Sequence, residues 1–309
     1  MKTHSPTSPG AYHGRFAPTP SGPLHLGSLV AALGSYLDAR ANEGRWSVRM
    51  DDTDRSRSRP ETIDTIMEQL EAHGLWSDDE MVLQSRRRDR YEAALEQLAS
   101  AGRVYRCRCT RARLRDWAAE HGQRMGAIGP VYPGFCRKID VAATERHALR
   151  FKVSDVERRV ADRRLGTIRQ ALAREVGDPV LRRADGPIAY HLANVVDDGD
   201  MGITQVVRGE DLAPMTPLHV ELAEALGLAT PNYLHLPLIN GPDGRKLSKT
   251  NHARPLDPSK APENLDAAAR VLGLTGPCQG SIDDRSIDDR LAGWSEEWGR
   301  RYPLSISPS

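Results

Sequence analysis

The first fifty residues contain a strand–helix–strand succession, which constrains the fold more than any other stretch of the chain. Residues 11–18 predict a buried strand, and a proline- and glycine-rich turn follows at 19–23. Apolar side chains recur at helical spacing from residue 24 to residue 42, and Gly44 supplies a stop. Residues 46–50 predict a second strand. Two strands joined by one crossover helix pair in parallel, so we predict an α/β protein with a parallel sheet.

Beyond this unit the pattern predicts further helices and strands around a less regular middle. We expect helices at 60–74, 86–102, 216–227 and 262–272, and strands at 189–198, 202–207 and 233–239. Residues 103–190 are less regular. After residue 272 the chain is polar, and its tail repeats the sequence SIDDR at 281–285 and 286–290. Two copies of five residues do not make a solenoid, so we interpret the repeat as a local duplication in a mobile tail.

Composition and charge exclude several classes of protein. The chain has 309 residues, of which 28% are charged and 39% hydrophobic, as in an ordinary globular protein. No apolar run approaches the roughly 18 residues needed to span a bilayer, and residues 1–11 hold no apolar signal core, so we expect a cytoplasmic protein. The net charge of +1 excludes a globally cationic nucleic-acid binder but allows a local basic patch. Residues 86–115 hold ten arginines and three acids, which indicates either such a patch or a solvated face.

A first motif, GRFAPTPSGPLHLG at positions 14–27, places a histidine and a glycine where a helix begins. Backbone N–H groups at a helix start are unsatisfied and suit phosphate. Gly27 would let a nucleotide approach the backbone closely, and His25 could donate to a phosphate oxygen. The chain contains neither a Walker A sequence nor G-x-G-x-x-G. The alternative is a plain strand-to-helix turn with a surface histidine.

A second motif, NGPDGRKLSK at positions 240–249, follows an expected buried strand. It is rich in glycine and holds two of the six lysines of the chain, Lys246 and Lys249. A loop that delivers lysines suits the stabilisation of charge on a transferring phosphoryl group. A solvated hairpin with ordinary surface lysines is the alternative.

Three of the four cysteines, Cys107, Cys109 and Cys136, form a group in the middle of the sequence. In a cytosolic protein such spacing indicates a metal sooner than disulfides. On spacing alone His121 could be a fourth ligand, and thiols without metal are the alternative. We expect Cys278, in the tail, to be free.

Together the two motifs resemble the paired signatures of class I aminoacyl-tRNA synthetases, and the first resembles the glutamyl branch. With the flanking residues 250–253, the chain is similar to the glutamyl-Q tRNA(Asp) synthetases, short paralogues of glutamyl-tRNA synthetases. The resemblance covers residues 12–260. It implies a Rossmann-like catalytic domain at 11–102 and 190–254, a zinc-containing insertion at 103–189, and a helical C-terminal segment with a polar tail at 255–309. Residues 1–10 would be a flexible leader, and no anticodon-binding domain is expected.

The resemblance also implies roles for individual residues. His25, Lys246 and Lys249 would act in catalysis and, with Gly27, bind ATP. Arg15 and Arg208 would face carboxylates of glutamate, Tyr190 would be a hydroxyl ligand, and Asp51 would take the α-ammonium group. The glutamate-binding set is completed by Phe16, Ala17, Pro18 and Thr19. The glutamyl branch usually has Glu at the position of Asp51. For Asp197 and Asp198 a structural role is equally acceptable. Tyr132 would complete the zinc ligands with Cys107, Cys109 and Cys136.

The activity implied is the ATP-dependent conversion of L-glutamate to glutamyl-adenylate, followed by transfer of glutamate to the queuosine base at the wobble position of tRNA(Asp). ATP with Mg²⁺ would be a substrate and one Zn²⁺ structural, and we expect a monomer. Two alternatives stay open. One is a shortened glutamyl- or glutaminyl-tRNA synthetase that charges a tRNA 3′ end, and the other is a tRNA-binding paralogue without catalysis.

Overall fold

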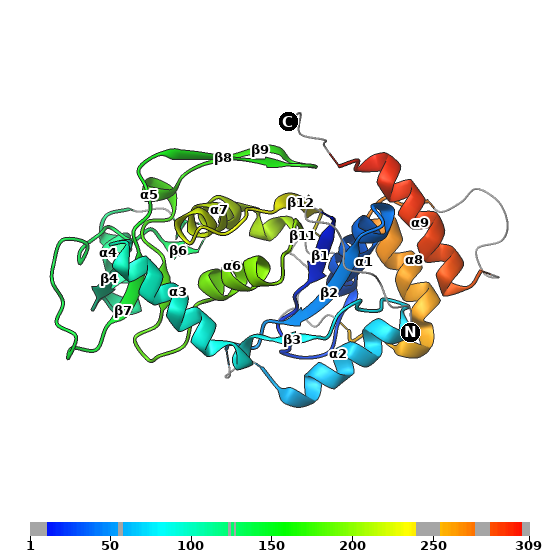
Figure 1. Cartoon of the computed structure of the whole chain (residues 1–309), viewed down its shortest axis with the longest axis horizontal. Helices are drawn as coiled ribbons and strands as arrows, with labels where there is room; N and C mark the ends of the chain where they lie inside the picture. The colour runs from blue at the N-terminus through cyan, green and yellow to red at the C-terminus, as the bar shows by residue number, and fades with distance from the viewer. Residues whose placement is uncertain are drawn as a thin grey trace.

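The predicted strand–helix–strand unit lies at the centre of the molecule. β1 (His13–Phe16) and β2 (Arg45–Met50) pair in parallel, and β3 (Val82–Leu83) pairs with the other edge of β2. The computed structural model describes residues 11–54, 58–122, 125–126, 128–238, 254–275 and 285–304. β11 (Gln205–Gly209) and β12 (Asn232–Leu236) form a second parallel pair. The Thr204 amide donates to the His13 carbonyl oxygen at 3.0 Å, which places β11 beside β1. The predicted parallel sheet is thus confirmed (Figure 1).

The two faces of the sheet differ in polarity because side chains alternate along each strand. Trp46, Val48 and Met50 point to one face, where they share a hydrophobic core with the apolar stripe of α1 (Leu26–Ala41). Ser47 and Arg49 occupy the alternate positions and are fully buried on the opposite face. Charged side chains of β2 are therefore directed away from α1.

The helix α1 stops close to the predicted glycine, for a different reason than expected. Its C-terminal turn is followed by Glu43, which has a φ of 52°, so the left-handed residue is not Gly44. A Cβ added to Gly44 would lie 2.4 Å from the ring of Tyr12. Gly44 is therefore required by the close approach of Tyr12.

The four further helices predicted from the sequence are confirmed, and one predicted strand is wrong. The confirmed elements are α2 (Pro60–Ala72), α3 (Arg88–Ser100), α7 (Thr216–Ala225) and α8 (Ala261–Val271). The strand expected at 189–198 is wrong, because this segment forms the helix α6 (Tyr190–Asp200). All residues from His191 to Asp198 are buried, so the polar residues Asn194 and Asp198 of α6 are enclosed like its apolar ones, although they recur at helical spacing.

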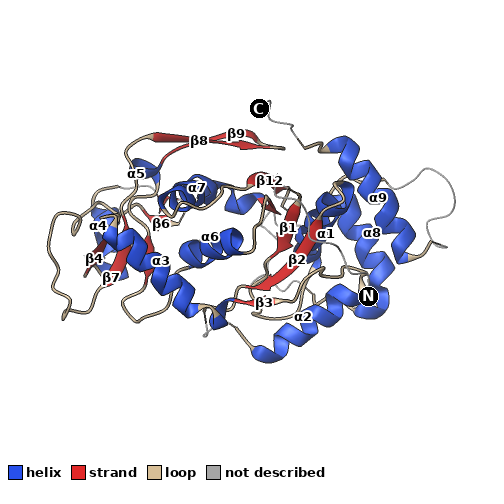
Figure 2. Ribbon diagram, in the orientation of Figure 1, coloured by secondary structure: helices blue, strands red, loops and turns tan. Residues whose placement is uncertain are grey.

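The middle of the chain forms a separate lobe, seen at the left of Figure 2. An antiparallel sheet is built from β4 (Val104–Cys107), β7 (Ala148–Phe151) and β10 (Val180–Arg182). Around it lie α4 (Arg111–Glu120), β5 (Met125–Gly126), β6 (Gly129–Pro130) and α5 (Leu172–Glu175). The hairpin of β8 (Glu157–Asp162) and β9 (Gly166–Ala171) leaves this lobe and meets β12, where Asp162 pairs with Tyr233.

The C-terminal part contains a helix that the sequence analysis missed. α9 (Ile287–Arg301) begins in the second SIDDR copy, with Ser286 as its N-cap, and packs with α8 against α1. Trp298 is fully buried, and its indole N–H donates to Asp38 at 2.8 Å. The expectation of a merely polar tail is therefore wrong for residues 287–301. No helix in the described ranges combines the length and the apolar character needed to cross a bilayer.

Candidate active site and metal centre

A cluster of buried charges lies between the polar face of β1 and β2 and the helix α6. Asp198 accepts from Arg15 Nε at 3.1 Å and from Arg49 Nη1 at 2.6 Å, and Asn194 contacts the same carboxylate at 3.1 Å. Burial raises the pKa of Asp198, but the charges of Arg15 and Arg49 outweigh it and bring that pKa down to about 2. Asp198 is therefore a carboxylate that holds two arginines in place.

Asp51 directly follows β2 and lies in the same cluster. Its Oδ1 accepts from Arg49 Nε at 2.8 Å, and its backbone N–H donates to the Pro18 carbonyl at 2.9 Å. Burial raises the pKa of Asp51 to about 6, against the lowering effect of Arg49. A carboxylate held in this way is suited to an ammonium group that supplies the missing positive charge.

Arg208 lies at the carboxyl end of β11 and has surroundings unlike those of Arg15. It is 5% exposed. Its guanidinium donates to Thr216 Oγ1 at 2.8 Å and to His219 Nδ1 and His235 Nε2 at 3.3 Å each. In the part of the chain that the structure describes, no carboxylate lies within 4.0 Å of its nitrogens. A buried arginine with neutral partners is a strong candidate for binding an anionic group of a ligand.

Tyr190, at the start of α6, connects these groups. Burial is the main cause that raises the pKa of its phenol, which also feels the charges of Arg208, Asp51 and Arg15. The four side chains predicted to contact glutamate therefore share one neighbourhood, where parallel strands end. Ligands of open α/β sheets bind at this edge.

Of the glutamate-binding residues predicted at the end of β1 and in the turn after it, three lie beside Asp51 and one does not. Ala17, Pro18 and Thr19 lie beside Asp51, because the Pro18 carbonyl accepts from the Asp51 amide. The ring of Phe16 instead belongs to the core on the α1 side, where it stacks on Trp46 with ring centroids 6.4 Å apart. Only the backbone of Phe16 is left to meet a ligand.

The residue predicted to bind phosphate also caps the start of α1. His25 is the N-cap residue, and its Nδ1 accepts from the amides of Gly27 at 3.0 Å and Ser28 at 3.3 Å. His25 also pairs with Pro255 in an isolated antiparallel bridge. Lys246 and Lys249 lie outside the described residues.

Sequence reasoning missed Arg49, Asn194 and the histidines around Arg208. The signal for Arg49 is its place in a buried strand, since it alternates with Val48 and Met50. For Asp198 the structure settles the open choice in favour of a buried ion pair, with Arg15 and Arg49 as partners. No local signal in the sequence joins Arg208 to His219, because they lie on different elements.

The predicted metal ligands converge in the separate lobe. The sulfurs of Cys107, Cys109 and Cys136 lie within 4.8 Å of one another, with Cys109 and Cys136 3.7 Å apart. Thiolates bound tetrahedrally at about 2.3 Å from a metal have sulfurs about 3.8 Å apart, which this spacing matches. The Tyr132 hydroxyl lies 3.3 Å from Cys107 Sγ and 3.8 Å from Cys109 Sγ. The cysteine triad could therefore hold a metal.

His121, the alternative ligand by spacing, has other contacts. Its ring stacks on that of Trp117 with centroids 4.4 Å apart, and its Nδ1 lies 2.9 Å from the Trp117 carbonyl oxygen. The triad of described cysteines does not include it. Of the two residues considered as a fourth ligand, it is Tyr132 whose hydroxyl lies beside the sulfurs.

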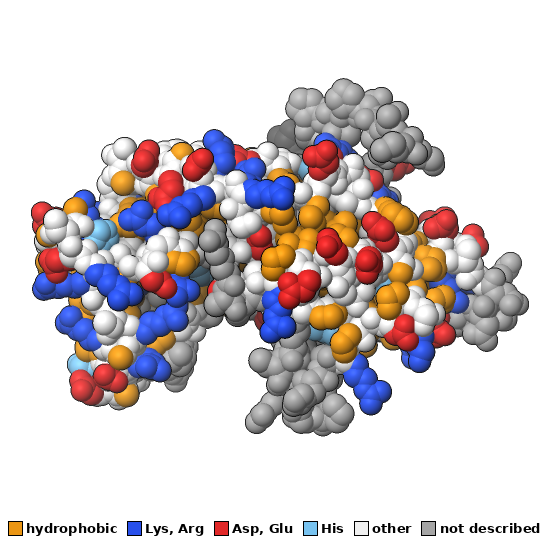
Figure 3. Space-filling view, turned by 90° about the horizontal axis from the view of Figure 1, so that it is seen from below, with side chains coloured by type: hydrophobic (Ala, Val, Ile, Leu, Met, Phe, Trp, Pro, Cys, Tyr) orange, Lys and Arg blue, Asp and Glu red, His pale blue; other side chains and the backbone are white. Residues whose placement is uncertain are grey.

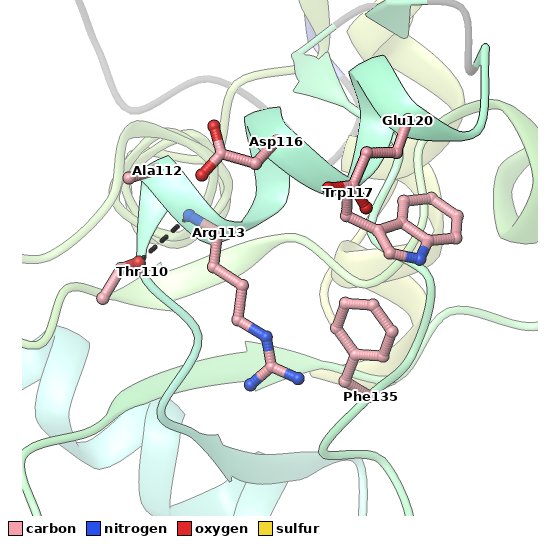
Figure 4. Close-up of a pocket in the computed structure, with 7 residues that line it drawn as sticks. All are labelled: Thr110, Ala112, Arg113, Asp116, Trp117, Glu120 and Phe135. Carbon is pink, nitrogen blue, oxygen red and sulfur yellow. Dashed lines mark hydrogen bonds between the residues drawn. The ribbon is translucent and has the colours of Figure 1, made fainter.

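A shallow hollow of about 550 Å³ lies next to the cysteines, on the surface of α4 (Figure 4). The guanidinium of Arg113 lies over the ring of Phe135 at 4.9 Å, and Trp117 meets the same ring edge to face. Asp116 and Glu120 also line it. None of the residues that line the hollow belongs to the charged cluster beside α6.

The arginine-rich stretch 86–115 does not form one patch. Several of its arginines are paired with acids of other elements: Arg87 with Asp197, Arg90 with Asp200, Arg103 with Glu221, and Arg108 with Glu145. Arg111, Arg113 and Arg115 on α4 have no ion pair within the described ranges. Figure 3 shows lysine and arginine side chains gathered over the separate lobe at its left.

Comparison with known proteins places this geometry in a family. A model of the family "tRNA synthetases class I (E and Q), catalytic domain" matches residues 12–266. The chain belongs to this family. It is therefore a member of the class I aminoacyl-tRNA synthetases, which are ligases.

The chain is 46% identical over 288 residues to a "Glutamyl-Q tRNA(Asp) synthetase" of Pseudomonas fluorescens, with 93% of this chain and 92% of the relative covered. A Pseudomonas aeruginosa protein of the same name is also 46% identical, with 94% of its length covered. Among solved structures, a glutamate-tRNA synthetase of Elizabethkingia anophelis superposes with a TM-score of 0.75 and 31% identity. This chain spans 65% of that protein's length, and 91% of this chain is covered.

Proposed function

We propose that this protein activates L-glutamate with ATP and transfers the glutamyl group to the queuosine base at the wobble position of tRNA(Asp). The observation that carries the proposal is the 46% identity, over more than nine-tenths of both chains, to relatives named glutamyl-Q tRNA(Asp) synthetase. We expect the reaction to take place in the cytoplasm and the enzyme to act as a monomer.

The charged cluster suits an amino acid with two carboxylates and one ammonium group. Arg208 supplies a buried positive charge for one carboxylate. Arg15 uses Nε and Nη2 to bind Asp198, so Nη1 is the end of its guanidinium that is available for the other carboxylate. Asp51 would bind the ammonium group, and Tyr190 would donate a hydrogen bond to the substrate. Phe16, Ala17, Pro18 and Thr19 would contribute backbone and small side chains around it.

In the first step, one oxygen of the glutamate α-carboxylate attacks the α-phosphorus of ATP. A phosphorus–oxygen bond to pyrophosphate breaks, and glutamyl-adenylate remains. The nucleophile is already ionised, so no general base is needed. Catalysis then consists of alignment and stabilisation of phosphate charge, for which we propose His25, Gly27, Lys246 and Lys249. Mg²⁺ would accompany ATP as part of the substrate.

In the second step, a hydroxyl of the queuosine ring attacks the activated carbonyl and AMP leaves. The arginines of α4 that have no ion pair with a described residue are candidates for contact with tRNA phosphates. We propose that Cys107, Cys109, Cys136 and Tyr132 hold one Zn²⁺, which would fix the lobe at 103–189 as a closed structural site. The catalytic domain would comprise 11–102 and 190–254, with 255–309 as a helical appendage.

A second candidate is a synthetase that charges a tRNA 3′ end. It is favoured by the 31% identity to the Elizabethkingia anophelis glutamate-tRNA synthetase. Both candidates share the activation step and differ only in the acceptor.

Glutamate-dependent exchange of labelled pyrophosphate into ATP tests the activation step. We expect exchange with the protein, ATP, Mg²⁺ and L-glutamate in the absence of tRNA, and none when glutamate is omitted. Absence of exchange both without and with tRNA would contradict the proposal and favour a tRNA-binding paralogue without catalysis.

A further inference from the structure

Among the described residues, the groups that accept hydrogen bonds from Arg208 are all neutral, and one of them is the Leu212 carbonyl of the short 3-10 helix Glu210–Met215, at 3.3 Å. β12 contributes His235, and the Arg208 guanidinium lies 5.6 Å from the ring centroid of Tyr233. α7 contributes Thr216 and His219. On α6, Tyr190 and His191 lie next to His219, with ring centroids 5.7 and 5.3 Å from it. Asp162 is screened by His235, whose Nδ1 it binds at 2.7 Å.

The hydrogen-bond chemistry fixes the tautomers of two histidines. An arginine can only donate, so His219 Nδ1 must accept and the proton of His219 resides on Nε2. His219 Nε2 lies 3.0 Å from His191 Nδ1, which therefore accepts in turn. Burial and the charge of Arg208 lower the pKa of His219 well below its ordinary value and bring that of His191 to about 4. Both rings are neutral at physiological pH.

His235 follows the same rule. Its Nδ1–H donates to Asp162, so its Nε2 accepts from Arg208 Nε at 3.3 Å and lies 3.1 Å from Thr216 Oγ1. His235, His219, Thr216 and the Leu212 carbonyl thereby hold Arg208, and no negative charge of the described residues is in contact with it. Arg15 differs, because a carboxylate of the protein already compensates it.

We infer that His219 is a positioning residue that keeps the charge of Arg208 uncompensated, so that the site selects a ligand with a carboxylate over one with a carboxamide. This inference rests on the proposed function and places the side-chain carboxylate of glutamate, which is a carboxamide in glutamine, at the histidine-bound arginine. A carboxylate would neutralise the buried guanidinium, and a carboxamide would leave it buried without a counter-charge. His191 holds His219 in the tautomer that accepts from Arg208.

Two substitutions of nearly equal shape separate charge from packing. His219→Gln keeps a neutral acceptor for Arg208 and a donor for His191. His219→Glu places a carboxylate of the protein against Arg208. We expect the KM for glutamate in pyrophosphate exchange to be at least about 10-fold higher in H219E than in H219Q, because a charge-assisted bond to the substrate is weakened. The KM for ATP should be the same in both, and the ratio of kcat/KM for glutamate to that for glutamine should fall only in H219E.

Thr216 provides a second matched pair if the histidine variants do not fold. Thr216→Asp brings a carboxylate to Arg208 Nη2, and Thr216→Asn is the neutral control. The same difference in glutamate KM is expected. Glutamate KM values within about 3-fold of each other in both matched pairs would overturn the inference. A merely structural role predicts that two substitutions of nearly equal shape raise the glutamate KM equally. Absence of glutamate-dependent exchange in the unsubstituted protein is a different result, which overturns the proposed function and this inference with it.

Discussion

His25 and Pro255 are paired in an antiparallel bridge, although 230 positions separate them in the sequence. The Leu256 amide reinforces this pairing by donating to the Leu24 carbonyl at 2.8 Å. The chain after the second motif therefore returns to the first turn of α1. This relationship supports the proposal that both motifs act on one nucleotide.

His25 can be tested separately as a cap and as a ligand. Asparagine is also a good N-cap residue, so His25→Asn should leave the melting temperature within about 2 °C of that of the unsubstituted protein. Pyrophosphate exchange should nevertheless fall by about 100-fold or more, because a donor to the phosphate is lost. His25→Ala should lose both the N-cap and the donor to the phosphate, and the lost cap should lower the free energy of unfolding by about 1 kcal/mol. An active H25N enzyme would contradict the role of the imidazole.

Asp51 should make kcat/KM for glutamate in the activation step fall at acidic pH. Its pKa lies at about 6, so the carboxylate is protonated below that pH and loses its charge for the substrate ammonium group. We expect kcat/KM for glutamate to fall about tenfold per pH unit below pH 6. Asp51→Asn should lower kcat/KM at all pH values and abolish its fall below pH 6. If the same fall persists unchanged in D51N, another group titrates.

Asp198 should be the most costly acid to remove from the cluster. Asp198→Asn leaves Arg15 and Arg49 buried without their shared counter-charge, which costs about 3–5 kcal/mol in the free energy of unfolding. Asp200→Asn is the matched control, because the exposed Asp200 on the same helix pairs with Arg87 and Arg90 at the surface and should cost about 1 kcal/mol or less. Chemical denaturation measures both. Equal costs would contradict the assigned role of Asp198.

The pH dependence of stability follows from the same residue. The pKa of Asp198 is lower in the folded protein, at about 2, than its ordinary value of 3.8. The ionised Asp198 therefore contributes about 2 kcal/mol to the free energy of unfolding, and this contribution is complete above pH 4 and is lost as the pH falls toward 2. In D198N this part of the acid destabilisation should disappear.

The cysteine triad should hold one zinc per chain. Elemental analysis of the purified protein should give about one equivalent, and Cys136→Ser should lower it below about a tenth and reduce the melting temperature. Cys278→Ser is the control and should change neither quantity. A fully stable protein without bound metal would contradict the proposed zinc site.

The sequence predicts those parts of the fold that depend on local pattern. α1 and β2 follow from periodicity, and the parallel sheet follows from their order. α6 was missed although Asn194 and Asp198 recur at helical spacing, and what the sequence does not show is that both are buried against Arg49, and Asp198 also against Arg15, from distant strands. α9 carries a readable signal that was missed, since Leu291, Trp294 and Trp298 recur at helical spacing on one face.

In the candidate site, too, some features could be predicted from local sequence patterns and others could not. Arg15, Asp51, Tyr190 and Arg208 could be named from motifs, and the structure brings them together. The charge balance among them could not be predicted. Whether Arg208 meets an acid or a histidine depends on how α7 packs against β11, and no local sequence pattern encodes that contact.

The most direct test of the account uses tRNA(Asp) with and without queuosine, together with ATP and labelled glutamate. The account predicts that label enters only the tRNA that contains queuosine, and that nuclease digestion leaves it in the anticodon fragment. Equal labelling of both tRNAs, or label at the 3′ end, would contradict it.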